Sequence, residues 1–131
     1  MTALRVGDVF QLRGVGNHFR LVASHPNGDG KAVVFGLTDV ENVDFPTCVF
    51  EKGDPSFLTK RTAVHYRRTQ LLPVAGFDLN GIRLVGRLSE SQLLKALNGA
   101  LKSEDIEERF LSLLPRTEAE AKAFAAKALQ T

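Results

Sequence analysis

The chain has 131 residues, of which 44% are hydrophobic, and its 17 basic and 15 acidic side chains leave a formal charge of +2. This length and composition predict one packed domain rather than a disordered chain, and so small a charge does not by itself indicate a nucleic-acid-binding protein. The single cysteine, Cys48, excludes an internal disulfide framework and fits a reducing cytoplasm.

The N-terminal residues MTALRVGDVF show no basic-then-apolar leader. No apolar run reaches the roughly 20 residues that a membrane-spanning helix needs. We therefore expect a cytoplasmic protein with no membrane segment.

Residues 6–74 have the pattern of short β-strands separated by turns. Alternating or continuous apolar residues mark the strands GDVFQLR, HFRLVASH, KAVVFGLT, TCVFE and AVHYRRTQLL. The turn PNGDG, residues 26–30, joins the second strand to the third, which predicts a hairpin over residues 18–38. Several short strands at this spacing predict a small barrel or a sandwich, and a barrel suits so short a region because closure removes exposed edges.

Residues 88–131 change to a helical period. Ser89 and Gln92 match a capping box that opens a leucine-rich helix. Ser103 is placed to cap a second amphipathic helix. Thr117 and Glu120 form another capping-box pattern before an alanine-rich last helix.

The change of period divides the chain into two regions. We expect a mainly β fold with C-terminal helices (α+β), in which residues 1–87 form a small β-barrel domain. Residues 88–131 then form a helical region of two or three helices, packed on the barrel or on a partner. The stretch AGFDLNGIRLVGR, residues 75–87, reads as a linker that can hold one more strand around residues 82–85.

Three polar side chains of the predicted hairpin point to one chemistry. Alternation places His18 and Arg20 on one face of their strand, and the hairpin brings Thr38 roughly opposite residue 18 or 19. An imidazole can exchange a proton with the 2′-hydroxyl or the leaving oxygen during RNA cleavage. A guanidinium and a hydroxyl can stabilise the charge on phosphorus. We predict that these three residues are catalytic and need no cofactor, and no ligand spacing supports a metal site.

The segment KRTAVHYRR, residues 60–68, is the one basic cluster without an intervening acid. It is predicted to hold the phosphates that flank the scissile bond, while Phe57 and Tyr66 stack bases. Because His65 alternates away from Tyr66, we expect Tyr66 to face the site. The predicted nucleic-acid-binding residues are Lys60, Arg61, Tyr66, Arg67 and Arg68.

Each candidate also has a structural interpretation, which the sequence leaves open. A histidine on a strand face is most often a surface or hydrogen-bonded structural residue. A basic run is usually a solvated face, and threonine is common in strands. His25 fits a turn residue, and Cys48 fits a buried, inert thiol.

Read in order, the motifs resemble those of the PemK/MazF-like toxin family. The stretch GDVFQLR looks like that family's first strand, HFRLVAS its second, and VVFGLTDV a strand ending in a functional threonine. The segments CVFEKGDPSFLTKRTAVHY and GRLSESQLLKALNGALKS resemble a later loop and the C-terminal helix of one branch. The likeness covers roughly residues 5–103.

This resemblance implies a homodimeric cytoplasmic toxin with an SH3-like barrel that cuts single-stranded RNA and is neutralised by an antitoxin protein. The family's catalytic arginine falls on His18 and its threonine on Thr38. The stretch GDPSF lacks the histidine of the family's GDHPF.

Two further functions compete with the ribonuclease. The barrel can serve as a non-enzymatic module that binds a peptide partner or nucleic acid without cleavage. Alternatively, a structural protein can assemble through the alanine-rich last helix.

Overall fold

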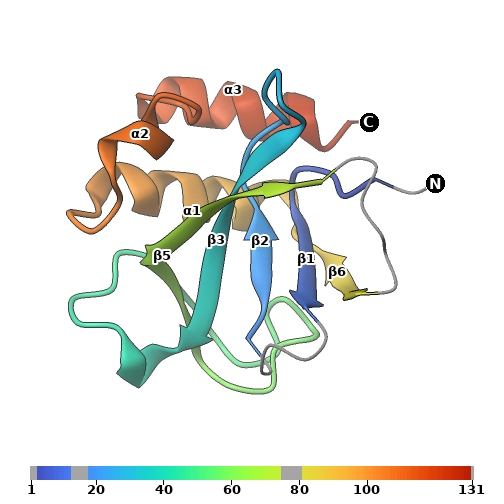
Figure 1. Ribbon diagram of the computed structural model, residues 1–131. Coiled ribbons are helices and arrows are strands. Elements are labelled where there is room, and N and C mark those ends of the chain that lie inside the picture. Colours follow the sequence, from blue (N-terminus) through green and yellow to red (C-terminus); the bar gives the residue numbers. More distant parts are fainter. Residues whose placement is uncertain (1–2, 13–17, 75–80, 131) are drawn as a thin grey trace.

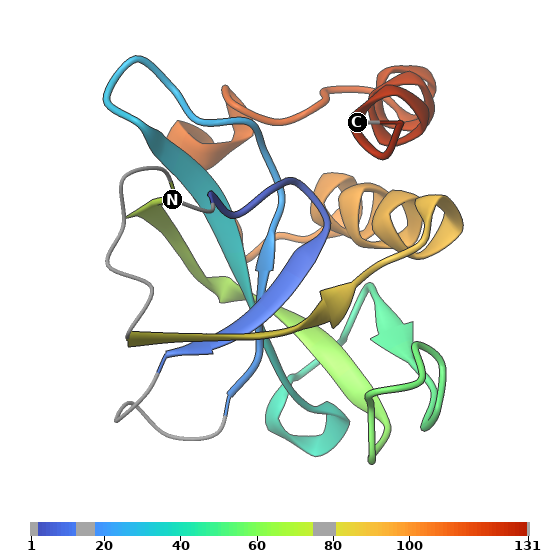
Figure 2. The ribbon, with the colours of Figure 1, turned by 90° about the vertical axis from the view of Figure 1, so that its right-hand side faces the viewer.

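The computed structural model describes residues 3–12, 18–74 and 81–130. In this part of the chain one antiparallel sheet has the strand order β4-β5-β3-β2-β1-β6. Figures 1 and 2 show it curling into a half-barrel with the helices along one side. The predicted class, mainly β with C-terminal helices, is confirmed. The strands are β1 (Asp8–Leu12), β2 (Arg20–Val22), β3 (Lys31–Asp39), β4 (Val49–Phe50), β5 (Thr62–Pro73) and β6 (Ile82–Arg87).

The predicted hairpin is formed by β2 and β3. The Asn27 side-chain oxygen accepts hydrogen bonds from the backbone N–H groups of Asp29 (2.9 Å) and Lys31 (3.1 Å). Gly30 follows with a φ of +74°, which glycine adopts without steric cost. The strands pair in one register, with Arg20 opposite Gly36 and Val22 opposite Val34.

The two faces of the sheet have different surroundings. On the inner face, Leu21, Phe35 and Val64 belong to a buried cluster that also contains Leu93 and Leu97 of helix α1 (Glu90–Lys102). On the outer face a smaller cluster is built from Leu4, Phe10, Val22, Ala32, Val34, Val74 and Ile82. Because side chains alternate along a strand, residues two positions from Val22 and Val34 point to this outer face, away from the helices.

Strand β5 carries a large bulge. Its residue His65 pairs with Gly36, and Gln70 pairs with Val34, so residues 66–69 lie against Phe35 alone. The Thr69 hydroxyl donates a 2.6 Å hydrogen bond to the carbonyl of Tyr66 inside this bulge. Such an insertion changes which side chains share a face on either side of it.

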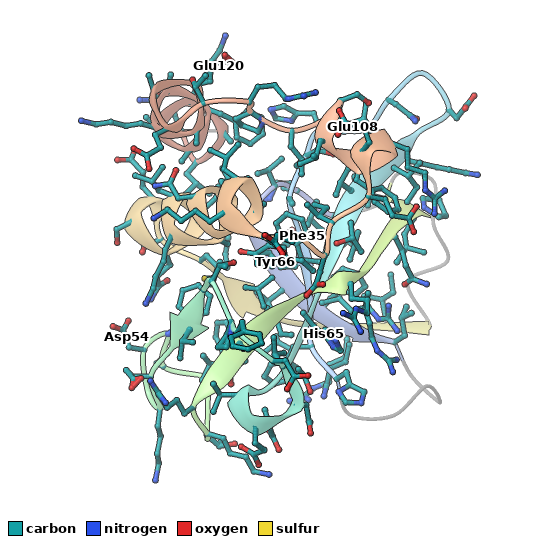
Figure 3. All side chains as sticks on the ribbon, turned by 90° about the vertical axis from the view of Figure 1, so that its left-hand side faces the viewer. Phe35, Asp54, His65, Tyr66, Glu108 and Glu120 are labelled. Atoms are coloured by element: carbon teal, nitrogen blue, oxygen red, sulfur yellow. The ribbon has the colours of Figure 1, made fainter. Side chains whose placement is uncertain are left out.

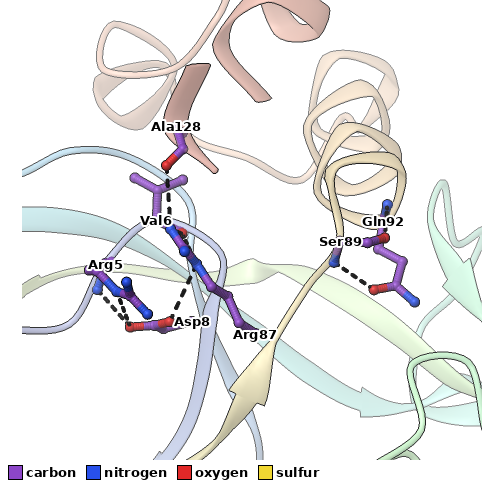
Figure 4. Close-up of polar contacts among 7 residues, drawn as sticks. All are labelled: Arg5, Val6, Asp8, Arg87, Ser89, Gln92 and Ala128. Carbon is purple, nitrogen blue, oxygen red and sulfur yellow. Dashed lines mark hydrogen bonds and ion pairs between the residues drawn. The ribbon is translucent and has the colours of Figure 1, made fainter. Parts of the chain in front are cut away.

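The helical region begins as predicted. Ser89 caps α1 in a full capping box, since Gln92 N–H donates to the serine hydroxyl (3.3 Å) and the glutamine oxygen accepts from Ser89 N–H (2.8 Å) (Figure 4). The prediction for Ser103 is wrong. Its N–H still bonds to Ala100 of α1, which ends there, and its hydroxyl accepts from Asp105 N–H.

The other two helices are short or weakly apolar. Helix α2 (Glu108–Leu111) is a single turn, whereas the sequence predicted a longer helix from Ser103. In α3 (Glu118–Ala128) the Thr117 hydroxyl accepts from Glu120 N–H as predicted. Apart from the short 3₁₀ helix η1 (Val40–Asn42), these are the helices of the described residues. None of them has the length and apolar character needed to cross a bilayer.

The helices pack on the inner face of the curled sheet. The inner-face cluster joins the sheet to Leu97 of α1, Phe110 of α2 and Ala125 of α3. The strands end at Arg87, where the sequence placed the boundary between regions. The predicted strand around residues 82–85 is β6, while residues 75–80 of the predicted linker lie outside the described part.

Candidate functional site

Two adjoining pockets open on the outer face of the hairpin, with volumes of about 430 and 380 Å³. Both are lined by His18, Phe19, Leu37, Thr38 and Asn42, and we call the two together the groove. The first pocket extends toward the turn before β5, and the second extends along the sheet. Further residues line them as follows: Asp39, Leu58, Thr59, Lys60 and Thr62 in the first, and Arg20, Gly36, His65 and Arg68 in the second.

The strand register explains the second pocket. Arg20 lies opposite Gly36 on β2–β3, and Gly36 lies opposite His65 on β3–β5, so the three residues form one row across the sheet. Gly36 has no side chain, and a Cβ there would lie 3.3 Å from Cβ of Arg68 and 3.8 Å from that of His65. The row therefore leaves an open floor between a guanidinium and an imidazole.

The predicted convergence of His18, Arg20 and Thr38 is present, since all three line the second pocket. The register that pairs Arg20 with Gly36 places His18 opposite Thr38 when it is continued by two residues. A hydrogen bond from Leu37 N–H to the Phe19 carbonyl (2.9 Å) shows that the pairing does continue. Their catalytic role remains a prediction.

Charge in the second pocket is of one sign. Its titratable lining residues are His18, Arg20, His65 and Arg68, and no acidic side chain is among the described residues that line it. Burial, and then the neighbouring Arg68, lower the pKa of Arg20 from its ordinary value, although an arginine remains protonated in proteins. An anion bound here would relieve the repulsion between the two guanidinium groups.

The same surroundings act on His65. Partial burial is the largest cause that lowers its pKa, followed by Arg68, Arg67 and His18, while Asp105 acts in the opposite direction. The neutral form of this imidazole is therefore favoured, and a neutral imidazole can accept a proton.

Two hydrogen bonds orient polar groups of the groove. Arg20 donates to the side-chain oxygen of Gln70 at 2.5 Å. Asn42 donates to the hydroxyl oxygen of Thr38 at 3.0 Å. Because the Thr38 oxygen already accepts a hydrogen bond, its own proton can be donated to a ligand oxygen.

The basic run separates in the structure. Lys60 and Arg68 line the groove, and Lys60 also forms a 3.4 Å ion pair with Asp39. Arg61 and Arg67 do not line it. Arg61 pairs with Glu51 (2.9 Å) and Arg67 with Asp105 (3.0 Å), both in exposed positions where ion pairs are weak.

The predicted assignment of Tyr66 and His65 is reversed. Tyr66 is 4% exposed, donates a 2.7 Å hydrogen bond to the carbonyl of Ala96 and meets Phe35 edge to face at 5.1 Å. In Figure 3 this pair lies beside α1, whereas His65 lies away from it. Tyr66 therefore cannot stack a base in the fold described here.

The alternation of His65 and Tyr66 is as predicted, and only the choice of the residue that faces the site was wrong. His65 pairs with Gly36 on the outer face, so the next residue, Tyr66, points to the inner face. In a regular strand Arg68 would share that inner face with Tyr66. The insertion at residues 66–69 instead turns Arg68 to the side of His65, so both line the groove. The sequence signal for His65 was only its alternation away from Tyr66. Phe57 is half-buried against Phe19, with ring centroids 5.9 Å apart, so it packs in the core.

Cysteine and metal chemistry have no site in the described residues. No group of three or more histidine, cysteine, aspartate or glutamate side chains in residues 3–12, 18–74 and 81–130 is arranged to hold a metal ion. Burial raises the pKa of the Cys48 thiol to about 11, so it stays protonated and unreactive at neutral pH. No family model and no curated protein matches this chain, and its function is therefore inferred from the groove.

Proposed function

We propose that this protein is a metal-independent endoribonuclease that cuts single-stranded RNA in the groove. The observation that supports it most is the second pocket, where two imidazoles, two guanidiniums and one hydroxyl line an open floor at Gly36. A strand with unpaired bases can place a phosphate on that floor, which a regular duplex does not allow as readily.

The reaction is an internal transfer at phosphorus. The 2′-hydroxyl loses its proton to His65, and its oxygen attacks the adjacent phosphorus. The bond from phosphorus to the 5′-oxygen breaks, and that oxygen receives a proton from His18. The products are a 2′,3′-cyclic phosphate and a free 5′-hydroxyl.

The other groove residues bind the charge that develops on the phosphate. Arg20 and Arg68 each present N–H donors to the non-bridging oxygens, and Thr38 donates its hydroxyl proton. Lys60 lies at the far end of the groove, where it can contact a neighbouring phosphate.

Cleavage of an unstructured RNA oligonucleotide in EDTA tests this proposal. We expect His18→Ala and His65→Ala each to lower the cleavage rate by roughly 10²- to 10⁴-fold. His25→Ala is the matched control, because that imidazole packs on Phe124 instead of lining the groove. An oligonucleotide with a 2′-deoxy sugar at the scissile position should bind and resist cutting. Equal cleavage by all three histidine variants would contradict the proposal.

The non-enzymatic alternative is favoured by the same cationic lining, which can bind phosphates without any proton transfer. Its signature is an RNA complex whose affinity falls with salt but which shows no scission by the wild-type protein. Affinity for a peptide partner, with none for RNA, would instead support a peptide-binding module.

The wider proposal is that the enzyme is a homodimeric cytoplasmic toxin of a toxin–antitoxin pair. Its support is the ordered likeness to PemK/MazF-like motifs over roughly residues 5–103. Expression should arrest growth, and His18→Ala or co-expression of the neighbouring gene's product should relieve the arrest. Sedimentation of the purified protein tests the dimer. Growth that is unaffected by the wild-type protein would contradict the toxin assignment while leaving the cleavage assay to decide the enzyme.

A further inference from the structure

Phe45 is an aromatic side chain that the groove does not use. It lies in the loop between η1 and β4, and 95% of its surface is exposed. Its φ is +53°, in the left-handed region that bulky residues rarely adopt. An exposed ring on an unfavourable backbone contributes nothing to the core, so its placement calls for a functional explanation.

A pocket of about 480 Å³ lies beside this ring. Phe45 itself lines it with Asp44 and Thr47, together with Arg67 of β5 and residues 102–105 at the end of α1. Arg67 and Asp105 neutralise each other in a 3.0 Å ion pair. The remaining charged lining residues are Asp44, Lys102 and Glu104, which leave a net negative charge.

Two connections join this pocket to the groove. Arg68 lines the groove and the adjacent Arg67 lines the Phe45 pocket, so their Cα atoms are about 3.8 Å apart. Asn42 of the groove precedes Phe45 by three residues, which limits their Cα separation to about 11 Å. A single-stranded RNA that lies in the groove can therefore continue past the bulge of β5 to Phe45.

We propose that Phe45 and its pocket receive one unpaired base of the RNA bound in the groove, and that this base carries an exocyclic amino group. The proposal rests on the proposed function, because it needs an RNA strand in the groove. The ring stacks on the face of the base, as aromatic side chains do in single-strand binding sites.

The charge of the pocket favours a base over a phosphate. Its net negative lining repels a phosphate, whereas the carboxylates of Asp44 and Glu104 can accept hydrogen bonds from an amino group. Neither side chain forms an ion pair or a hydrogen bond with another residue within 3–12, 18–74 and 81–130. Cytosine offers such a donor and uracil does not.

An abasic scan of a 2′-O-methyl oligonucleotide, which binds without being cut, tests the proposal. We expect one abasic position to weaken binding to the wild-type protein by roughly 5- to 100-fold. Phe45→Asn removes the ring but tolerates the left-handed backbone. This variant should bind the intact oligonucleotide more weakly by the same factor, and an abasic site at that position should then cause no further loss of affinity. Phe45→Tyr should behave as wild type. At that position cytosine should bind more tightly than uracil.

The outcomes separate the two proposals. Leu113→Ala removes another exposed apolar side chain and is the matched control. If Phe45→Asn binds the whole series as the wild type does, the base site is wrong, although cleavage in the groove still stands. If the scan succeeds but no RNA is cut, the catalytic proposal is wrong and the base site stands. A change of oligomeric state without a change of RNA affinity would instead make Phe45 a contact between copies of this chain and overturn the base site.

Discussion

Gly36 shapes the groove through the side chain that it lacks. It lies between Arg20 and His65 in one row of the sheet, where any other residue would fill the floor. A Cβ at this position would lie 3.3 Å from Cβ of Arg68, which is closer than ordinary packing allows. The four basic side chains can therefore surround a phosphate only because this position is empty.

Replacement of Gly36 by alanine should impair function more than folding. The added Cβ displaces Arg68, and a shift of about 1 Å in a positioning group can lower a rate by about 10²-fold. We expect cleavage to fall by about 10- to 100-fold, while unfolding in urea changes by less than about 2 kcal/mol. Gly28→Ala is the control, because nothing lies within 4 Å of a Cβ there. Undiminished cleavage by Gly36→Ala would show that the substrate does not reach this floor.

The pKa of His65 gives a prediction for the pH dependence of the reaction. Because that pKa is lowered, the neutral base persists below the ordinary histidine value of about 6.5 and is lost as pH falls through the lowered pKa. The acid limb of kcat/KM should therefore lie below pH 6.5. Arg68→Gln removes a positive charge that lowers the pKa of His65. It should therefore move the acid limb of kcat/KM to higher pH, whatever its effect on the maximal rate. A limb at or above pH 6.5 would contradict the role of His65 as base.

The same shift affects stability in a direction that can be checked separately. As pH falls below about 6.5 the unfolded chain binds a proton at His65 before the folded protein does, so folding loses free energy across that window. The difference in unfolding free energy between wild type and His65→Gln should therefore change with pH between about 6.5 and the lowered pKa. It should be constant above pH 7.5, where both states are neutral.

At the scale of elements, the sequence predicted the regular parts and missed the irregular one. The β2–β3 hairpin and the Ser89 cap follow from local residues, Asn27 and Gly30 in the turn and Gln92 in the capping box. Local patterns fix such features because the partners are only a few residues apart.

The bulge in β5 could not be predicted in this way. It depends on the pairing of residues 66–69 against Phe35, which is distant in sequence, and it decides the face on which Arg68 lies. Simple alternation identified His18, Arg20 and Thr38. It also separated Tyr66 from His65, but it does not say which of the two faces the groove, and Tyr66 was assigned in place of His65. The length of helix α2 was overestimated. Apolar residues four positions apart are typical of a helix, but here Ile106 and Phe110 are both buried although only a single turn is helical.

The contact between α1 and β5 depends on Gly99. A Cβ there would lie 2.3 Å from the Tyr66 hydroxyl oxygen and 2.8 Å from Cβ of Cys48. The Thr47 hydroxyl also donates a 2.7 Å hydrogen bond to the Gly99 carbonyl. The missing side chain lets the Tyr66 hydroxyl reach Ala96, and this contact fixes the inner side of β5 behind the groove.

Gly99→Ala should destabilise the protein although alanine is the better helix former. The helix gains about 0.5–1 kcal/mol, but the overpacked contact costs about 1–3 kcal/mol and disrupts the Tyr66 hydrogen bond. We expect a net loss of about 1–2 kcal/mol in the free energy of unfolding in urea. Asn98→Ala is the control on the same helix, where removal of a buried side-chain oxygen without a partner should be neutral or stabilising. A stabilised Gly99→Ala would show that Tyr66 moves aside without cost.

For the whole molecule, Arg87 links the two ends of the described chain. Its guanidinium donates to the carbonyls of Val6 (3.2 Å) and Ala128 (3.3 Å), and it lies 3.7 Å from the buried carboxylate of Asp8 (Figure 4). The positive charge also suits the C-terminal end of α3. The fully buried residues of this helix are alanines, Ala121, Ala125 and Ala128, and Phe124 is only partly buried against the core. The polar contact at its end therefore adds to a modest apolar contact in holding α3 against the rest of the fold.

Arg87→Met should therefore loosen α3 and lower global stability while leaving the groove intact. Loss of the charged hydrogen bonds, with Asp8 left buried, should cost about 2–3 kcal/mol in urea unfolding. Hydrogen exchange should accelerate most in residues 118–128. Arg87→Lys keeps the positive charge but lacks the planar guanidinium with its several N–H donors. Its free energy of unfolding should therefore lie between those of the wild type and Arg87→Met. Arg83→Met, an exposed change on the same strand, should remain within about 0.5 kcal/mol of wild type in free energy of unfolding.

Because the groove lies on the other side of the sheet, RNA cleavage by Arg87→Met at a temperature where it is folded should match the wild type. Lost cleavage with full folding would mean that α3 and the groove are coupled.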